Sequence, residues 1–268
     1  MVAAPVNPDL RPRAEEDTPV AFRVQGLSCA YGDRDVLTDV TLDIPARRVT
    51  ALIGPSGCGK STFLRVLNRM NELREPVRVR GAVLLDGVDL HAPSTDPVAL
   101  RRRVGMIPRD PWLFPGSVWD NVAFALDAAG VRDPATRAER VESALQRAAL
   151  WDDLKDDLTR PARAVPPRLR QQLCVARALA AQPEVLLLDE PTSGLDAVAT
   201  ARMEELIADL RDTLTVVIVT HGLQQAARVS QTTAFFLDGA LVEVGDTRTI
   251  FTRPRREQTR DYVTGRTG

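Results

Sequence analysis

The chain has 268 residues, enough to bury a hydrophobic core as one large domain or two modest ones. Hydrophobic residues make up 44% and charged residues 26%, as in an ordinary globular protein, and the formal net charge of -1 argues against nucleic acid as a main partner. No apolar run approaches the roughly 20 residues that span a bilayer, and residues 1–20 lack the apolar segment of a signal peptide. We therefore expect a cytoplasmic protein.

The chain opens with a polar segment, which is followed by short strands. Residues 1–20 are rich in Pro, Arg and Glu without periodicity, which predicts a flexible tail. Strand-like runs follow at 22–24, 40–44 and 82–85, and the last of them is closed by an Asp-Gly turn signal. These runs predict an antiparallel β layer in this part of the chain.

A glycine-rich loop lies between an apolar run at 49–53 and a helical pattern that starts at Thr62. It matches the pattern G-x-x-x-x-G-K-[ST], in which glycines let the backbone close around phosphate. The loop N–H groups face the anion, Lys60 reaches the terminal phosphates, and the Ser61 hydroxyl is placed for Mg²⁺. The alternative is a turn that caps the helix and binds nothing. We expect a nucleoside triphosphate site formed by Gly54, Pro55, Ser56, Gly57, Cys58, Gly59, Lys60, Ser61 and Thr62.

The second half of the chain alternates helices with buried-type strands. A helix-rich segment extends from 118 to about 180. Apolar runs at 185–188 and 215–219 then predict two strands, and the amphipathic segment 199–210 predicts a helix between them. Strand, helix, strand is the order typical of a parallel sheet, so the expected class is an α/β fold with a parallel-sheet core.

Polar residues follow both of these strands. Asp189 and Glu190 come directly after the first, and His221 follows the second. In an α/β sheet the carboxyl ends of the strands present groups to a bound ligand. Asp189 then holds Mg²⁺, Glu190 polarises the water that attacks the γ-phosphate, and His221 senses the terminal phosphate. The alternatives are turn-forming or capping carboxylates and a surface histidine, but the upstream phosphate loop favours the catalytic interpretation.

With these motifs in place, the sequence resembles the ATP-binding subunit of an ABC transporter, from about residue 22 to 268. The resemblance implies that Tyr31 stacks on adenine, that Asp196 belongs to the D-loop, and that His221 is the switch histidine. The alternative for Tyr31 is a core tyrosine of the β layer. Further segments resemble the ATPases of bacterial phosphate importers in particular, namely 67–71, 96–106, 224–230 and 261–266.

The resemblance implies a P-loop NTPase fold of the ABC type over 21–265, with an antiparallel β subdomain and a helical subdomain at about 110–180. It implies ATP and Mg²⁺ as ligands and hydrolysis coupled to import, with inorganic phosphate as the expected substrate. It further implies two membrane permease subunits at the inner face of the cell membrane, a second ATP-binding subunit that is identical or a paralogue, and only indirect contact with a periplasmic-type substrate-binding protein. The run 112–115 either docks against a permease or packs within the helical part.

Two places depart from the family's pattern. Where the family has the signature Leu-Ser-Gly-Gly-Gln, residues 165–169 read Val-Pro-Pro-Arg-Leu, and proline has no N–H to donate to the γ-phosphate on the partner subunit. Where the family has a glutamine that touches Mg²⁺, this chain has Arg109. Either Arg168 and Arg170 supply charge in trans like an arginine finger, or the chain binds ATP but hydrolyses it slowly, as a regulatory subunit or as the partner of an intact paralogue.

Overall fold

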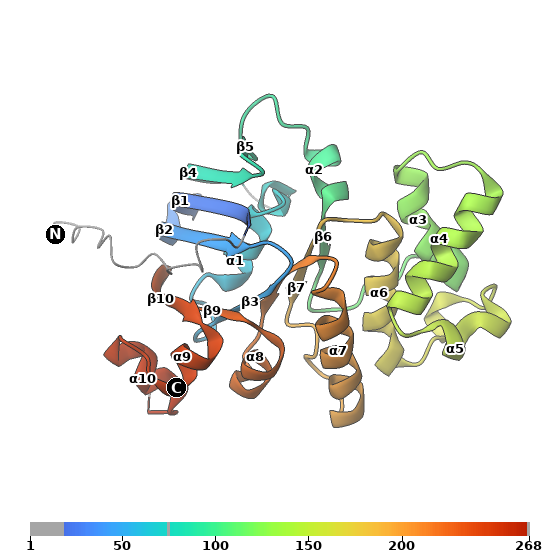
Figure 1. The fold of residues 1–268 in the computed structure, drawn as a ribbon. Helices are drawn as coiled ribbons and strands as arrows, with labels where there is room; N and C mark the ends of the chain where they lie inside the picture. The colour runs from blue at the N-terminus through green and yellow to red at the C-terminus, as the bar shows by residue number, and fades with distance from the viewer. Residues whose placement is uncertain (1–18, 74–75, 267–268) are drawn as a thin grey trace.

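The protein is described here by a computed structural model that covers residues 19–73 and 76–266. The tail expected at 1–20 lies outside the described residues except for its last two positions, and Val20 already belongs to the first strand. Figure 1 shows two sheets side by side, with one group of helices standing apart at the right of the view.

The smaller sheet is antiparallel, as the sequence predicts. Its order is β2-β1-β4-β5, and its strands are β1 (Val20–Tyr31), β2 (Arg34–Pro45), β4 (Val77–Leu85) and β5 (Val88–Asp89). The strands are longer than the runs that predicted them. Register shifts in β1 between Val24 and Cys29, where Gly26 has a φ of 58°, move the buried side of the strand and so break the alternation that marks a strand in sequence.

The larger sheet forms the expected parallel core, with one antiparallel strand at its edge. Its order is β10-β9-β3-β8-β7-β6, and only the β10–β9 pair is antiparallel. The strands are β3 (Val49–Ile53), β6 (Val104–Ile107), β7 (Val185–Asp189), β8 (Thr215–Val219), β9 (Thr232–Leu237) and β10 (Ala240–Asp246). Every residue of β3, β7 and β8 is buried, which is why these strands appear in sequence as continuous apolar runs.

Helices surround the larger sheet and also form the group at the right of Figure 1, where α3, α4 and α5 lie beyond α6. Polar caps define several helix starts, including a reciprocal capping box between Ser117 and Asp120 at α3. The α-helices are α1 (Lys60–Val66), α2 (Pro97–Arg103), α3 (Val118–Ala128), α4 (Pro134–Arg147), α5 (Trp151–Leu154), α6 (Pro167–Ala180), α7 (Ala197–Leu210), α8 (Leu223–Val229), α9 (Thr247–Thr252) and α10 (Glu257–Val263). Short 3₁₀ turns cover Met70–Leu73, Lys155–Asp157 and Ala162–Ala164. A helix that could cross a bilayer is not found within 19–73 and 76–266.

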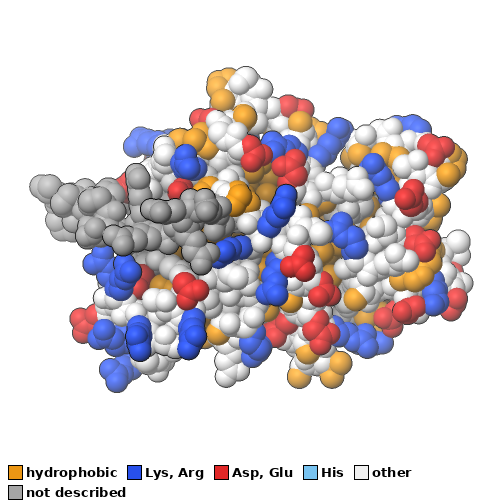
Figure 2. Space-filling model, in the orientation of Figure 1, with side chains coloured by type: hydrophobic (Ala, Val, Ile, Leu, Met, Phe, Trp, Pro, Cys, Tyr) orange, Lys and Arg blue, Asp and Glu red, His pale blue; other side chains and the backbone are white. Residues whose placement is uncertain are grey.

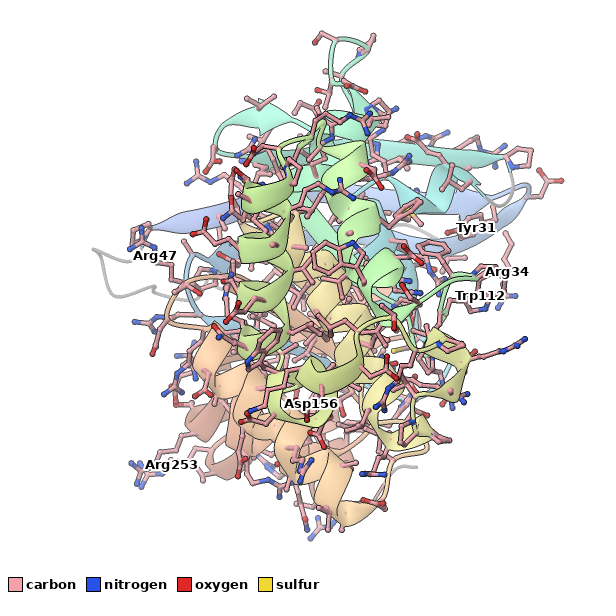
Figure 3. The ribbon with its side chains drawn as sticks, turned by 90° about the vertical axis from the view of Figure 1, so that its right-hand side faces the viewer. Tyr31, Arg34, Arg47, Trp112, Asp156 and Arg253 are labelled. Atoms are coloured by element: carbon pink, nitrogen blue, oxygen red, sulfur yellow. The ribbon has the colours of Figure 1, made fainter. Side chains whose placement is uncertain are left out.

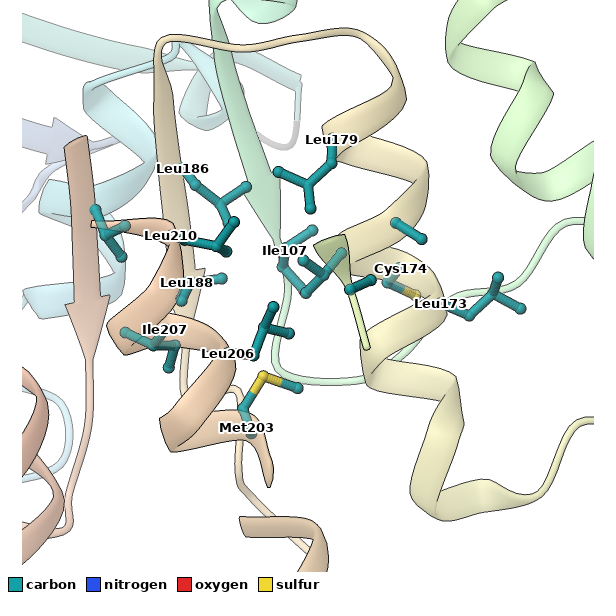
Figure 4. Close-up of a cluster of buried hydrophobic side chains, with 14 of the residues drawn as sticks. Ile107, Leu173, Cys174, Leu179, Leu186, Leu188, Met203, Leu206, Ile207 and Leu210 are labelled. Atoms are coloured by element: carbon teal, nitrogen blue, oxygen red, sulfur yellow. The ribbon is translucent and has the colours of Figure 1, made fainter. Parts of the chain in front are cut away.

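The hydrophobic core connects the sheet to the helical group. Figure 4 shows Leu186 and Leu188 of β7 between side chains of α6 and α7, including Leu179 and Leu206. A second buried cluster joins the antiparallel sheet to α1 and to the other face of the larger sheet. Because α1 and α6 are both packed into these cores, the loops before them are held at fixed positions.

Charge is distributed unevenly over the surface. On the face shown in Figure 2, Lys and Arg side chains gather at the lower left, over the C-terminal helices α9 and α10. The exposed arginines from α9 to the end of the described chain are Arg248, Arg253, Arg255, Arg256, Arg260 and Arg266. The overall net charge of -1 therefore conceals a local excess of positive charge at the end of the chain.

Candidate nucleotide-binding site

The glycine-rich loop joins β3 to α1, as the sequence pattern requires. The φ values of Gly54, Gly57 and Gly59 are 145°, 80° and 99°. Residues with a side chain rarely adopt such a backbone conformation. A Cβ at Gly54 would lie 2.1 Å from the carbonyl oxygen of Phe236, and one at Gly59 would lie 2.7 Å from Leu37 Cδ2. Glycine is thus required at both positions by conformation and by space, so the loop can follow this tight path between β3 and the helix.

Lys60 lies inside the loop. Its side chain is only 4% exposed, and its Nζ donates hydrogen bonds of 2.7 Å to the carbonyl oxygens of Gly54 and Pro55. The Sγ of Cys58 lies 3.4 Å from the same nitrogen. These contacts hold the ammonium group where a phosphate cradled by the loop would meet it.

Ser61, at the start of α1, contacts the end of β7. Its hydroxyl donates a 2.7 Å hydrogen bond to Asp189 Oδ1, while Arg65 Nη2 donates to Asp189 Oδ2 at 3.2 Å. Mg²⁺ usually takes one or two protein oxygens and completes its shell with water and phosphate, so the Ser61 and Asp189 oxygens fit that ion. The sequence analysis missed Arg65, although its spacing of four residues from Ser61 places both on one face of the helix.

Glu190 lies at the carboxyl edge of the sheet with partners on both carboxylate oxygens. Its Oε1 is 2.7 Å from His221 Nε2, and its Oε2 is 3.4 Å from Arg109 Nε. The same Arg109 nitrogen donates a 3.1 Å hydrogen bond to the Ser193 hydroxyl. The Glu190 backbone has a φ of 51°, in the left-handed region that is uncommon for a residue with a side chain. Two residues that the sequence places at the carboxyl edge of the sheet are thus in direct contact.

These groups open onto one cavity of about 650 Å³. Tyr31 and Arg34 come from facing ends of β1 and β2, and Figure 3 shows them on the same side of the molecule as Trp112. The site residues predicted from sequence that line this cavity are Tyr31, Ser56, Gly57, Gly59, Lys60, Ser61, Thr62, Glu190 and His221. A second cavity, of about 670 Å³, shares Arg109, Glu190 and His221 with the first. The Glu190 carboxylate therefore lies at the junction of two hollows.

The remaining predicted residues lie behind or beside this cavity. Gly54, Pro55 and Cys58 form the inner wall of the loop, and Asp189 reaches the cavity through Ser61. Asp196 is not among the residues that line the cavity. It is the N-cap of α7, and its Oδ1 accepts a 2.8 Å hydrogen bond from Ala199 N.

The segment at 165–169 forms the start of α6. Pro166 is the N-cap and Pro167 the first helical residue, and the helix has no side-chain cap. Arg168 is exposed. Arg170 is not free to act as a mobile finger, because its guanidinium donates 3.0 Å hydrogen bonds to the carbonyl oxygens of Val165 and Arg163. Of the two arginines considered for a role in trans, only Arg168 presents a solvent-exposed head.

The run 112–115 divides between surface and interior. Trp112 is 73% exposed, and Figure 3 shows it at the edge of the molecule. Phe114 instead packs inward, with Arg177 4.5 Å above its ring and two hydrogen bonds of its backbone to Asn121. The segment is therefore anchored to the helical group at Phe114 while Trp112 projects outward.

A C-terminal residue, Tyr262, supports the loop from behind. It stacks on Phe235 of β9 with ring centroids 4.9 Å apart and an interplanar angle of 21°. Burial raises the pKa of the Tyr262 hydroxyl. Since β9 pairs with β3 and the Phe236 carbonyl touches the space beside Gly54, helix α10 stabilises the strand against which the loop is built.

Comparison with known proteins agrees with this architecture. A family model described as ABC transporter matches residues 37–193. The chain is similar in structure to CbiO1 of Clostridium perfringens, part of the ABC transporter complex CbiONQ, with a TM-score of 0.76, 24% identity and coverage of 92% of this chain and 97% of that one. It is also similar to a bacterial Atm1-family ABC exporter with ATP bound, with a TM-score of 0.76 and 24% identity; all of this chain matches 45% of the exporter chain. At these identities the two structures establish the shared fold.

Proposed function

This chain belongs to the ABC transporter family, as an ATP-binding domain, and on that premise we propose that it is the ATPase subunit of an importer for inorganic phosphate. Members of the family generally use ATP with Mg²⁺ and couple its hydrolysis to transport. The importer direction and the phosphate substrate are supported by the sequence segments 67–71, 96–106, 224–230 and 261–266, which resemble phosphate importers.

The observation that carries the proposal is the convergence of Lys60, Ser61, Glu190 and His221 on one cavity. Lys60 and the loop N–H groups, from Gly54 to Thr62, hold the phosphates. Ser61 and Asp189 hold Mg²⁺, which neutralises charge on the transferred phosphoryl group. Glu190 orients the attacking water, and His221, 2.7 Å from that carboxylate, contacts the γ-phosphate.

Other residues complete the proposed assembly. Tyr31, which lines the cavity, stacks on the adenine base, and Asp196, as the cap of α7, shapes the D-loop. Trp112 offers an exposed apolar side chain to a membrane permease. The chain would therefore work at the inner face of the cell membrane, on two permease subunits and beside a second ATP-binding subunit, with a periplasmic-type binding protein as an indirect partner.

A second function is favoured by one observation, the start of α6. Its two prolines cannot donate to a γ-phosphate on a partner subunit, and each lost transition-state donor typically costs about 10² to 10³ in rate. In this alternative the chain binds ATP but turns it over slowly, as a regulatory subunit or as the partner of an intact paralogue.

Transport measurements test the proposal. Vesicles holding the chain and its permease subunits are expected to take up labelled phosphate when ATP is supplied on the side of the chain, while a Lys60→Ala complex should not. Uptake of a different anion in preference to phosphate would overturn the substrate. Phosphate uptake that the Lys60→Ala complex retains would overturn the role of this site.

A further inference from the structure

Arg109 introduces a full positive charge beside the groups expected to act on the γ-phosphate. Its Nε lies 3.4 Å from Glu190 Oε2 and 3.1 Å from the Ser193 hydroxyl, and the residue lines the same cavity as Lys60 and Ser61. We propose that Arg109 takes over part of the charge neutralisation that Mg²⁺ supplies, so that this chain binds metal-free ATP nearly as well as Mg-ATP. This inference rests on the proposed ATP site.

The charge of the cavity supports this inference. Three cations on its lining, Arg34, Lys60 and Arg109, face a single carboxylate, Glu190, which leaves a net charge of +2 when His221 is neutral. Asp189 adds little to that balance, because Arg65 pairs with it at 3.2 Å. Metal-free ATP carries about four negative charges at neutral pH, so a cavity that is already cationic attracts it without a metal ion.

The geometry leaves Arg109 able to reach a ligand. Its side chain is 59% exposed, and both of its contacts use Nε alone. Within 19–73 and 76–266 neither Nη nitrogen has a hydrogen-bonding partner, so the outer fork of the guanidinium is available for two parallel bonds to phosphate oxygens. The Glu190 side of the ion pair is only 13% exposed, but the guanidinium of Arg109 is open to solvent, where a ligand phosphate can approach its outer fork.

Arg109 also reduces the advantage of bound Mg²⁺. A divalent cation at Ser61 and Asp189 would lie in the same cavity as this fixed guanidinium, and Asp189 Oδ2 is already bonded to Arg65. Like charges repel, and a carboxylate shared with an arginine is a poorer metal ligand. Both effects lower the affinity for Mg-ATP relative to metal-free ATP.

The test is calorimetric titration of ATP into the purified full chain, once with excess Mg²⁺ and once with EDTA. For the wild type we expect the two dissociation constants to agree within about threefold. In Arg109→Gln the dissociation constant in EDTA should exceed that in Mg²⁺ by about tenfold or more, whereas Arg109→Lys should keep much of the wild-type tolerance because it keeps the charge.

Arg34→Gln is the matched control, since it removes one cation from the lining of the same cavity, beside Tyr31. It should weaken ATP binding by a similar factor in both buffers. A wild type that depends on Mg²⁺ as strongly as Arg109→Gln does would overturn the inference and leave the ATP site standing. The absence of ATP binding in either buffer would overturn the proposed function itself.

Discussion

Helices α1 and α6 both begin without a side-chain cap, yet their first turns differ in what they can offer a ligand. At α1 the cap is Gly59 in the left-handed conformation, and the loop before it turns its backbone around a buried lysine. At α6 the cap and the first residue are Pro166 and Pro167, which have no N–H groups. The first helix start can turn backbone N–H groups toward an anion, whereas two positions at the start of the second have no N–H group to donate.

The two helix starts bear on different properties of the chain, the first on its affinity for ATP and the second on its rate of ATP hydrolysis. The groups that one chain supplies to its own nucleotide lie together around Lys60, whereas the group that it would supply to a partner's nucleotide lies at the altered start of α6. A chain of this kind is expected to bind ATP but to form a closed dimer poorly.

Lys60→Ala should have the largest effect. It removes the ammonium that we propose to face the terminal phosphates, and two charge-assisted hydrogen bonds of about 1.5 to 3 kcal/mol each correspond to a loss of about 10² to 10⁴ in affinity. Calorimetry measures this loss directly. Lys155→Ala is the natural control, because Lys155 is the other lysine of the chain and pairs with Asp152 at the surface. Equal ATP affinity in the two variants would place the nucleotide elsewhere.

Glu190→Gln tests the other half of the comparison, the ability of two chains to form a closed dimer. The substitution removes the carboxylate that we propose to orient water, and in an ATPase with an intact signature segment it would trap an ATP-bound dimer. Here the variant should elute as a monomer with ATP and Mg²⁺ on a sizing column, because Pro166 and Pro167 cannot donate to the partner's phosphate. A stable homodimer would show that another group, such as Arg168, replaces the missing donors.

Ser117→Ala changes the helical group without touching the cavity. The Ser117 hydroxyl caps α3 by accepting a 3.0 Å hydrogen bond from Asp120 N, and losing such a cap costs about 1 kcal/mol of unfolding free energy. Hydrogen bonds from Ser117 also hold the pKa of Asp120 below its ordinary value. The contribution of Asp120 is therefore present above its unfolded pKa and is lost as the pH falls through its lowered, folded value. Urea unfolding of the wild type and the variant at neutral and acid pH measures both effects. The ATP affinity of the variant should stay unchanged. A weaker ATP affinity would mean that the helical group influences the phosphate loop.

Arg168→Ala should have the smallest effect. The side chain is exposed on the first turn of α6, so its removal should change ATPase turnover by less than about twofold. Steady-state phosphate release from the wild type and the variant at equal concentration decides the point. A sharp drop in the variant, starting from an ordinary wild-type rate, would make Arg168 a finger that acts on the partner's nucleotide.

The sequence predicts the parts of this molecule that depend on local pattern. The glycine-rich loop and its lysine are marked by their own sequence pattern, and the two buried strands place Glu190 and His221 at the same edge of the sheet, although their direct contact was not predicted. The class of fold is confirmed, because strands β3, β7 and β8 are buried along their whole length and leave a clear apolar signal.

Contacts between side chains from distant segments could not be predicted in the same way. Arg65 and Asp189 are 124 residues apart, and the sequence holds no sign that they pair. The sequence marks Arg109 as unusual, but its contacts with Glu190 and Ser193 depend on how the segment after β6 folds across the edge of the sheet. The bulge in β1 likewise hides the true length of that strand, because the shifted register interrupts the period of two.

The most direct test of the central claim is the steady-state ATPase rate of the wild type against a chain in which residues 165–169 are rewritten as Leu-Ser-Gly-Gly-Gln together with Arg109→Gln. If the altered start of α6 limits turnover, the wild type should be slow and the rewritten homodimer at least about tenfold faster, because a single recovered donor contributes roughly 2 kcal/mol or more to the transition state. A slow wild type whose rate the rewriting leaves unchanged would contradict the account and place the defect elsewhere in the chain.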